Sequence, residues 1–152
     1  MKAVVQRVDN ATVTVEGKTV GAVESGLFVL LGVSEEDTEE HAELLARKVA
    51  NLRIFCDDND KMNLSVLDVG GGVLTVSNFT LCADTAKGNR PSFINAKKPD
   101  EADRLYNFFV EQLKAFGVKS TEKGQFGADM HINAALKGPV TIILDTDVWC
   151  KK

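Results

Sequence analysis

The first third of the chain is dominated by patterns that predict strands. Residues 11–15 alternate apolar and polar side chains, as a strand with one buried face does, and residues 2–8 form a similar stretch. A Glu-Gly-Lys turn at 16–18 leads into residues 19–23, which predicts a hairpin. Residues 27–33 are apolar throughout, so we expect a strand that is covered on both faces.

A helical pattern follows this strand. Ser34 is expected to cap the helix, with Asp37 three residues later and acidic residues in the first turn, where they suit the helix dipole. The apolar residues Leu45, Val49 and Leu52 keep helical spacing. The first helix is therefore predicted to start directly after the buried strand.

The rest of the chain predicts a second helix and four more strands. The helix is expected to begin at Pro99 or Asp100 and to end at Gly117. Its apolar stripe consists of Ala102, Leu105, Phe109, Leu113 and Phe116. The strands are expected at 52–56, from the glycines 70–72 to Leu81, at 125–135 and at 139–145.

The order of these elements predicts the fold class. Strands outnumber helices, and no repeat or linker interrupts the chain. We therefore predict a single α/β domain over residues 1–152, built as three layers, α/β/β: mixed sheets packed face to face, with two long helices covering one side. The tail, residues 146–152, shows no clear structure in the sequence, although Trp149 is a candidate to dock on the surface or on a partner chain.

Composition limits the cellular compartments in which the protein is expected. No apolar run is long enough to span a bilayer, and Gln6 and Arg7 interrupt the only apolar stretch near the start, so neither a membrane segment nor a signal peptide is expected. Three cysteines without paired spacing fit a reducing compartment, and we predict the cytoplasm.

One segment of the chain is basic although the net charge of the protein is negative. The net charge is −4, so the chain as a whole has no general attraction to nucleic acid. Residues 84–98 contain Lys87, Arg90, Lys97 and Lys98 with Asp84 as the single acid. This segment is either a loop that contacts phosphates or a solvated loop with scattered charges, and composition does not separate the two.

Two short motifs carry the candidate chemistry. Residues 77–81, Ser-Asn-Phe-Thr-Leu, close the strand that follows the three glycines. Residues 138–141, Gly-Pro-Val-Thr, open the last strand, and a peptide bond before proline adopts the cis form at modest cost. A cis Gly-Pro unit can present two carbonyl groups side by side to a ligand without an intervening side chain.

The usual groups of a hydrolase are missing from the sequence. His41 and His131 have no partner at metal-ligand spacing, and Cys82 has no recognisable base or cationic neighbour. We therefore predict no metal site and no cofactor.

The two motifs, in this order and spacing, resemble the D-aminoacyl-tRNA deacylase family, also described as D-tyrosyl-tRNA(Tyr) deacylases. The resemblance extends from Gln6 to Leu144 and includes the intervening residues 61–63, 90–93 and 128–130. It implies a homodimeric hydrolase that cleaves the ester between a D-amino acid, or glycine, and the 3′-terminal adenosine of tRNA. Such an enzyme serves the quality control of translation.

The resemblance also implies roles for individual residues. In the family, Thr80 corresponds to the residue most often suspected of direct chemistry. A threonine nucleophile needs a base, and the motif shows none, so we favour Thr80 as a residue that positions the ester or the attacking water. The N–H groups of Phe79 and Thr80 are expected to be oxyanion donors, and Ser77 to fix the strand end or the ribose. The vicinal ribose hydroxyl of the substrate replaces a protein base. Phe126 and Met130 correspond to residues that line the adenine pocket.

Chiral selection is expected from Gly138 and Pro139. In the family this pair enters the active site of the partner subunit, accepts hydrogen bonds from the substrate ammonium group and leaves no room for an L side chain. Arg7 corresponds to a residue that braces the pair. Without the resemblance, the pair would be interpreted as a turn before an edge strand.

Two departures from the family pattern and two alternative functions remain. Asn78 replaces the usual Gln and is one methylene shorter, which weakens any contact to the terminal nucleotide, and Lys137 precedes Gly138 in place of a small polar residue. One alternative is a relative that removes L-alanine from tRNA through a trans Gly-Pro unit, although such relatives carry Pro where this chain has Ser77. The other is a module that binds RNA ends without catalysis.

Overall fold

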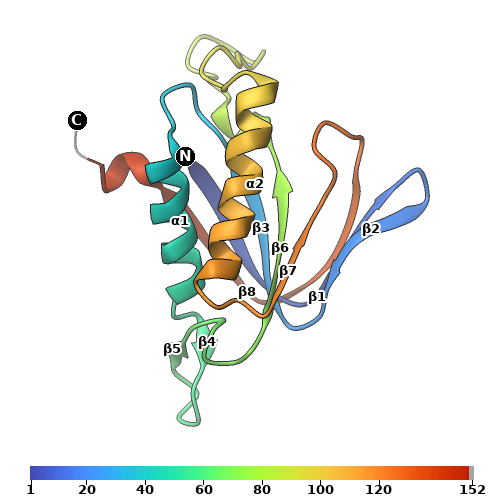
Figure 1. Cartoon of the computed structure of the whole chain (residues 1–152), viewed down its shortest axis with the longest axis vertical. Helices are drawn as coiled ribbons and strands as arrows, with labels where there is room; N and C mark the ends of the chain where they lie inside the picture. Colours follow the sequence, from blue (N-terminus) through green and yellow to red (C-terminus); the bar gives the residue numbers. More distant parts are fainter. Residues whose placement is uncertain (151–152) are drawn as a thin grey trace.

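The structure, a computed structural model, describes residues 1–150. In this range two helices lie on one side of a mixed six-stranded sheet, and a short hairpin lies at the edge (Figure 1). The helices are α1 (Glu39–Asn51) and α2 (Pro99–Ala115). The strands of the large sheet are β1 (Lys2–Val15), β2 (Lys18–Val23), β3 (Gly26–Gly32), β6 (Gly72–Ser77), β7 (Ser120–Lys123) and β8 (His131–Asp145). The hairpin consists of β4 (Phe55–Cys56) and β5 (Met62–Leu64). The predicted α/β class is confirmed.

The large sheet is strongly curled. Its order is β2-β1-β3-β6-β7, and β8 pairs with β1 on the remaining side. Strands β3, β6 and β7 run parallel, whereas every partner of β1 is antiparallel. The curl brings β2 close to β7: a Cβ on Gly21 would lie 2.6 Å from the carbonyl oxygen of Lys123, so only glycine fits there. The sheet is thus nearly closed, and its two halves form the two β layers.

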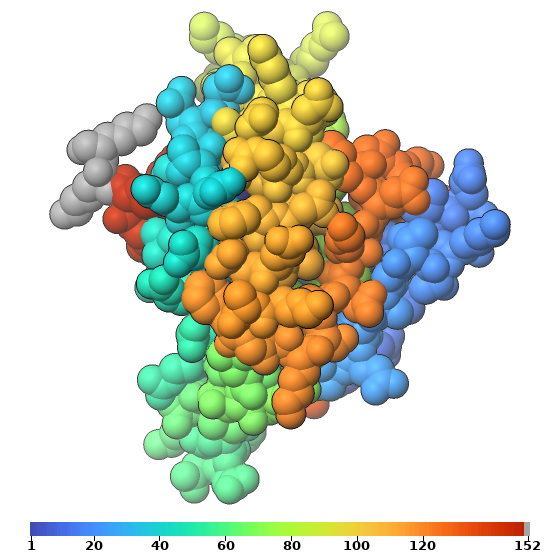
Figure 2. Space-filling view, in the orientation of Figure 1, coloured from blue at the N-terminus to red at the C-terminus, as the bar shows by residue number. Residues whose placement is uncertain are grey.

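Two apolar cores stabilise this arrangement. The larger core lies between the sheet and the helices, which stand side by side over this face (Figure 2). Its largest fully buried side chains include Leu27, Leu31, Leu45, Leu105 and Phe109. The smaller core fills the inside of the curl with Val8, Ala11, Val13, Val23, Phe28, Leu74 and Val76. Because neighbouring residues of a strand point to opposite faces, β3 supplies Leu27 and Leu31 to one core and Phe28 to the other.

The start of the first helix differs from the prediction. The N-cap of α1 is Thr38 and not Ser34. The Asp37 carboxylate accepts a hydrogen bond from the Ser34 N–H group at 2.6 Å and also pairs with the buried ammonium group of Met1. These contacts fold residues 34–37 into a tight turn. The helix therefore begins after this turn, with Thr38 as its N-cap.

Strand limits also differ from the prediction. Residues 2–8 and 11–15 form one strand, β1, the strand expected at 52–56 is confined to Phe55–Cys56, and β5 was not predicted. The strand after the three glycines ends at Ser77, and residues 79–82 form a 3₁₀ turn, η1 (Phe79–Cys82). β7 was not predicted, because its sequence, Ser-Thr-Glu-Lys, is polar and half exposed. Residues 125–135 and 139–145 do not form two separate strands: one strand, β8, runs from His131 to Asp145 and bulges opposite Arg7.

The tail is more ordered than the sequence indicates. Residues 146–148 form a second 3₁₀ turn, η2 (Thr146–Val148), and Trp149 packs against the larger core under the ammonium group of Lys48. Residues 151–152 lie outside the described part of the chain. Neither α1 nor α2 has the length and hydropathy that a membrane span requires.

Candidate active site

A cavity of about 880 Å³ opens where β6 ends, beside the start of α2. Its wall includes five of the residues that were singled out in the sequence: Ser77, Asn78, Phe79, Phe126 and Met130. These residues come from two segments some 50 positions apart, the strand end and the loop before β8. The volume lies within the range of small-molecule sites, and the wall is mostly apolar with a few polar groups.

The polar edge of this cavity is formed by the end of β6 and the start of η1. Ser77, Asn78 and Phe79 belong to the cavity wall, whereas Thr80, which follows them in η1, does not. The N–H group of Asn78 donates to the carbonyl oxygen of Leu31 at 2.8 Å, which fixes the motif to the end of β3. The hydroxyl group of Thr80 donates to the side-chain oxygen of Asn78. Phe79 and Thr80 open the 3₁₀ turn, and the first N–H groups of a helical turn have no acceptor within it.

The Gly-Pro motif lies in a loop that bulges from β8. Gln6 pairs with Thr141 and Val8 with Leu136, so residues 137–140 all stand opposite Arg7. The guanidinium group of Arg7 donates to the carbonyl oxygen of Lys137 at 3.2 Å and to that of Ile54 at 2.8 Å. The Gly138–Pro139 bond is cis. We call residues 137–140 the Gly-Pro loop.

The structure does not bring the Gly-Pro loop to the cavity. Ser77 pairs with Leu31 across the sheet, whereas Arg7 pairs with Leu27. Four residues of strand separate these levels, which corresponds to roughly 13 Å along the sheet. Within one chain, Arg7, Gly138 and Pro139 therefore form one group, and the residues around the cavity form another.

The comparisons with known proteins decide the family. The family model described as D-Tyr-tRNA(Tyr) deacylase matches residues 4–145. The chain belongs to this family. The D-aminoacyl-tRNA deacylases of Koribacter versatilis and Caldicellulosiruptor bescii are 57% and 53% identical to it over 146 residues, which are 96% of this chain and 97% of each relative. The predicted membership of a deacylase family, and hence the prediction of an enzyme, are confirmed.

Solved structures agree with the fold of this deacylase family member. A structure titled c-Myc DNA Unwinding Element Binding Protein superposes with a TM-score of 0.90 at 44% identity, covering 95% of this chain and 98% of that one. A probable eukaryotic D-amino acid tRNA deacylase superposes with a TM-score of 0.79 at 16% identity, over 94% of this chain and 97% of the other. The second likeness supports the fold alone.

The cavity contains residues that the sequence did not single out as site residues. Phe93 and Ile94 line its mouth, and the ring of Phe93 meets the ring of Phe79 edge to face at 5.0 Å. Tyr106 supports Phe126 from below, with ring centres 6.0 Å apart, and its hydroxyl group donates to the carbonyl oxygen of Thr75 at 2.9 Å. Burial raises the pKa of the Tyr106 phenol, so this group stays neutral. For Phe93, the available signal was its place in the segment 90–93, which takes part in the family resemblance.

Other reactive side chains lie outside this cavity. His41 accepts a hydrogen bond from the Thr38 N–H group at the start of α1, and the Cys82 thiol lies 3.6 Å from the Ser34 hydroxyl. Both border a second cavity of about 1010 Å³ whose wall contains none of the predicted site residues. Across residues 1–150, no three His, Cys, Asp or Glu side chains gather in a way that could hold a metal ion.

Proposed function

We propose that the protein is a D-aminoacyl-tRNA deacylase that releases D-amino acids and glycine from tRNA. Its membership of the family supports the activity, and one observation in the structure supports the location of the active site. The same cavity gathers the polar motif Ser77–Asn78 with the apolar pair Phe126 and Met130. An apolar wall for a flat base beside polar groups for a ribose suits the 3′-terminal adenosine of aminoacyl-tRNA.

The proposed chemistry is ester hydrolysis without a protein base. Water adds to the carbonyl carbon, the bond to the ribose oxygen breaks, and that oxygen takes up a proton. The partner of the Thr80 hydroxyl is an amide oxygen of Asn78, which is too weak a base to make threonine a nucleophile. Thr80 therefore positions the ester or the water, and the N–H groups of Phe79 and Thr80 stabilise the oxyanion.

Asn78 has a task in this scheme despite its shorter side chain. Its amide oxygen orients the Thr80 hydroxyl, and its backbone N–H group anchors the motif to β3. The terminal nucleotide is then held chiefly by the cavity wall. Lys137, the other departure from the family pattern, pairs with Asp9 at 3.5 Å.

We assign the rejection of L-aminoacyl-tRNA to the Gly-Pro loop of a second copy of the chain. The loop is exposed and carries main-chain carbonyl groups without a side chain at Gly138. Because it is remote from the cavity of its own chain, a two-fold partner has to supply it. The outer face of β8 fits a self-complementary interface, since Ile132, Leu136 and Ile143 are exposed, the last by 75%.

Deacylation of D-tyrosyl-, L-tyrosyl- and glycyl-tRNA by the purified protein tests the function. We expect rapid release of D-tyrosine and glycine and very slow release of L-tyrosine, because the filter senses only which side of Cα is occupied. Equal rates on the two tyrosyl enantiomers would refute the filter. Preferential release of L-alanine would favour the first alternative, against which Ser77 argues, and binding without turnover would favour an RNA-end binding module.

A second experiment tests the dimer. Ile143→Glu places a charge on the outer face of β8 and should yield a monomer without deacylase activity, as light scattering and the same assay would show. Val69→Glu, at an exposed valine in the turn before β6, is the matched control and should leave mass and activity unchanged. An active Ile143→Glu monomer would refute a filter supplied by the partner. The predicted compartment remains the cytoplasm, where charged tRNA is used.

A further inference from the structure

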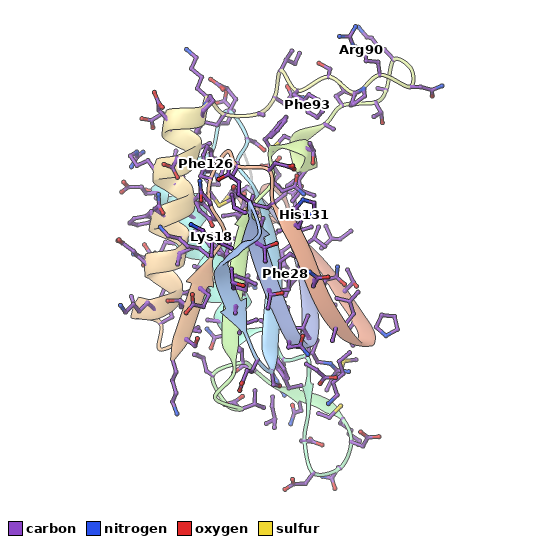
Figure 3. All side chains as sticks on the ribbon, turned by 90° about the vertical axis from the view of Figure 1, so that its right-hand side faces the viewer. Lys18, Phe28, Arg90, Phe93, Phe126 and His131 are labelled. Carbon is purple, nitrogen blue, oxygen red and sulfur yellow. The ribbon has the colours of Figure 1, made fainter. Side chains whose placement is uncertain are left out.

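Residues 84–96 form an arm that projects from the body next to the cavity, at the top of Figure 1. Its base is pinned: Asp84 and Ser92 exchange two backbone hydrogen bonds of 2.8 and 2.9 Å, and the N–H group of Glu35 donates to the carbonyl oxygen of Asn95 at 2.9 Å. The tip, residues 85–91, is fully exposed. Figure 3 shows Arg90 at this tip and Phe93 between the tip and Phe126. The arm therefore extends outward from the mouth of the cavity.

The arm is basic although the protein is acidic. Lys87 and Arg90 lie on the tip, and Lys97 and Lys98 follow at the base, where they line the cavity. The single acid of the arm, Asp84, is engaged locally, since its carboxylate accepts from the Ala86 N–H group at 2.9 Å. Among the ion pairs of residues 1–150, none involves Lys87, Arg90 or Lys98. These charges are available to an anionic partner.

Where the arm meets the cavity, Phe79 of η1 and two residues of the arm, Phe93 and Ile94, form an apolar ledge. Their exposed fractions are 59%, 36% and 82%, which is unusual for three neighbouring large apolar side chains. All three also belong to the cavity wall. Aromatic faces beside lysine and arginine side chains are the combination with which proteins hold single-stranded nucleic acid, because bases stack while phosphates pair with cations.

We propose that the ledge and the arm bind the nucleotides that precede the terminal adenosine in the tRNA 3′ strand. The proposal rests on the function proposed above, because it places the terminal adenosine in the cavity. The strand leaves the cavity over the ledge, where one base stacks against Phe93, and its phosphates then pass Lys87 and Arg90. The local positive charge also explains how an acidic protein holds RNA: it contacts a short end and repels the rest.

The test compares a full substrate with a minimal one. D-tyrosyl-adenosine has no preceding nucleotides, whereas D-tyrosyl-tRNA has them all. The double variant Lys87→Ala/Arg90→Ala should lose about 10-fold in kcat/KM on the tRNA at moderate salt and should match the wild type on D-tyrosyl-adenosine. The dependence of log(kcat/KM) on log salt should flatten by about 0.7 for each phosphate contact removed.

Lys114→Ala/Lys119→Ala is the matched control. These lysines are exposed at the far end of α2, about 25 Å along the helix from the arm, and should leave both substrates and the salt dependence unchanged. Phe93→Ala should lower kcat/KM about 10-fold more on the tRNA than on the minimal substrate, because a stacking face is gone. Phe93→Tyr, which keeps that face, should restore the activity on tRNA.

A binding experiment separates this proposal from the proposed function. Fluorescence anisotropy with an uncharged single-stranded RNA that ends in CCA requires no catalysis. Weaker binding by the arm variant, with the control variant equal to the wild type, supports the arm as an RNA contact even if no ester is hydrolysed. Equal binding, equal tRNA kinetics and equal salt slopes for the arm variant and the wild type would overturn the proposal.

Discussion

The two ends of the central sheet are built in opposite ways. At the end of β6 the protein contains a cavity. Side chains from the end of β6 and from the loop before β8 surround it, and the polar residues Ser77 and Asn78 lie at its edge. At the other end the backbone itself protrudes. There Arg7 stands opposite the Gly-Pro loop and donates one hydrogen bond to it, at the carbonyl oxygen of Lys137. One end offers a space to be filled, and the other offers main-chain groups with little around them.

This difference indicates that neither end is a complete site. In the function proposed above, the cavity holds the terminal nucleotide but has no group that could compare the two sides of a Cα atom. The Gly-Pro loop has carbonyl groups for an ammonium ion but no pocket. The two ends complement each other only if a second copy turns its loop toward the cavity, and four experiments can sharpen or break this view.

The largest effect is expected from Gly138→Ala. The new Cβ would lie 2.8 Å from the backbone nitrogen and a methyl group of Val140 and 3.3 Å from Nη2 of Arg7, at a φ of +129° that L residues rarely adopt. A shift of the loop of about 1 Å should lower kcat/KM on D-tyrosyl-tRNA by about 100-fold.

Gly17→Ala is its control. Gly17 also has a positive φ, +77°, but nothing lies within 4 Å of an added Cβ. This variant should share the backbone strain and keep the activity, with circular dichroism checking the fold of both proteins. Wild-type turnover by Gly138→Ala would show that the protruding end takes no part in the reaction.

The hydroxyl group at the hollow end should matter somewhat less. Thr80→Val removes the group that bonds to Asn78 while it keeps the shape, and we expect a loss of about 30-fold in kcat with a smaller change in KM. Thr80→Ser should retain most of the activity, because it retains the hydroxyl. If Thr80→Val and Thr80→Ser cleave the ester at the same rate in single-turnover assays, Thr80 has no positioning role.

Arg7→Met tests the brace of the protruding end. The methionine stem fills the same space but cannot donate to the carbonyl groups of Lys137 and Ile54, so kcat/KM should fall by about 10-fold while the dimer persists. Arg53→Met is the matched variant, since Arg53 also donates to a backbone oxygen, that of Asn63 at 2.9 Å in the β4–β5 hairpin. Equal activities of the two variants would argue against a brace.

The smallest effect concerns Tyr106, below the cavity. Its pKa is raised by burial, so the contribution of Tyr106 to folding stability should be constant below the ordinary tyrosine pKa of about 10. This contribution should fall as pH rises above that value, because the unfolded chain releases the phenol proton first. Tyr106→Phe should cost about 1 kcal/mol at neutral pH and abolish the alkaline fall.

Urea unfolding at a series of pH values measures both effects. Because Tyr106 is the single tyrosine, the absorbance of tyrosinate in the folded protein reports this group directly. An ordinary titration curve in the folded state would mean that the Tyr106 hydroxyl group is open to water.

Much of the fold could be predicted from local patterns. The alternation at 11–15 and the apolar stripe of α2 gave the correct elements, because each element buries one face and its period shows in the sequence. The start of α1 was wrong, because Asp37 pairs with the ammonium group of Met1, 36 residues away. β7 was missed, because it is held by backbone hydrogen bonds to β6 and its polar side chains show no strand pattern in the sequence.

For the site, the sequence by itself determined the two motifs and the family, because the identity and spacing of residues 77–81 and 138–141 are properties of the chain alone. Only the tertiary structure decided which residues share a cavity: Phe126 and Met130 join Ser77, whereas Arg7 and Gly138 do not. It also decided that Phe79, Phe93 and Ile94 remain exposed beside a basic arm. The physical reason is that the exposure of a side chain and its distance from other side chains depend on how strands far apart in the sequence pair. A curled sheet brings together segments that no local sequence pattern connects.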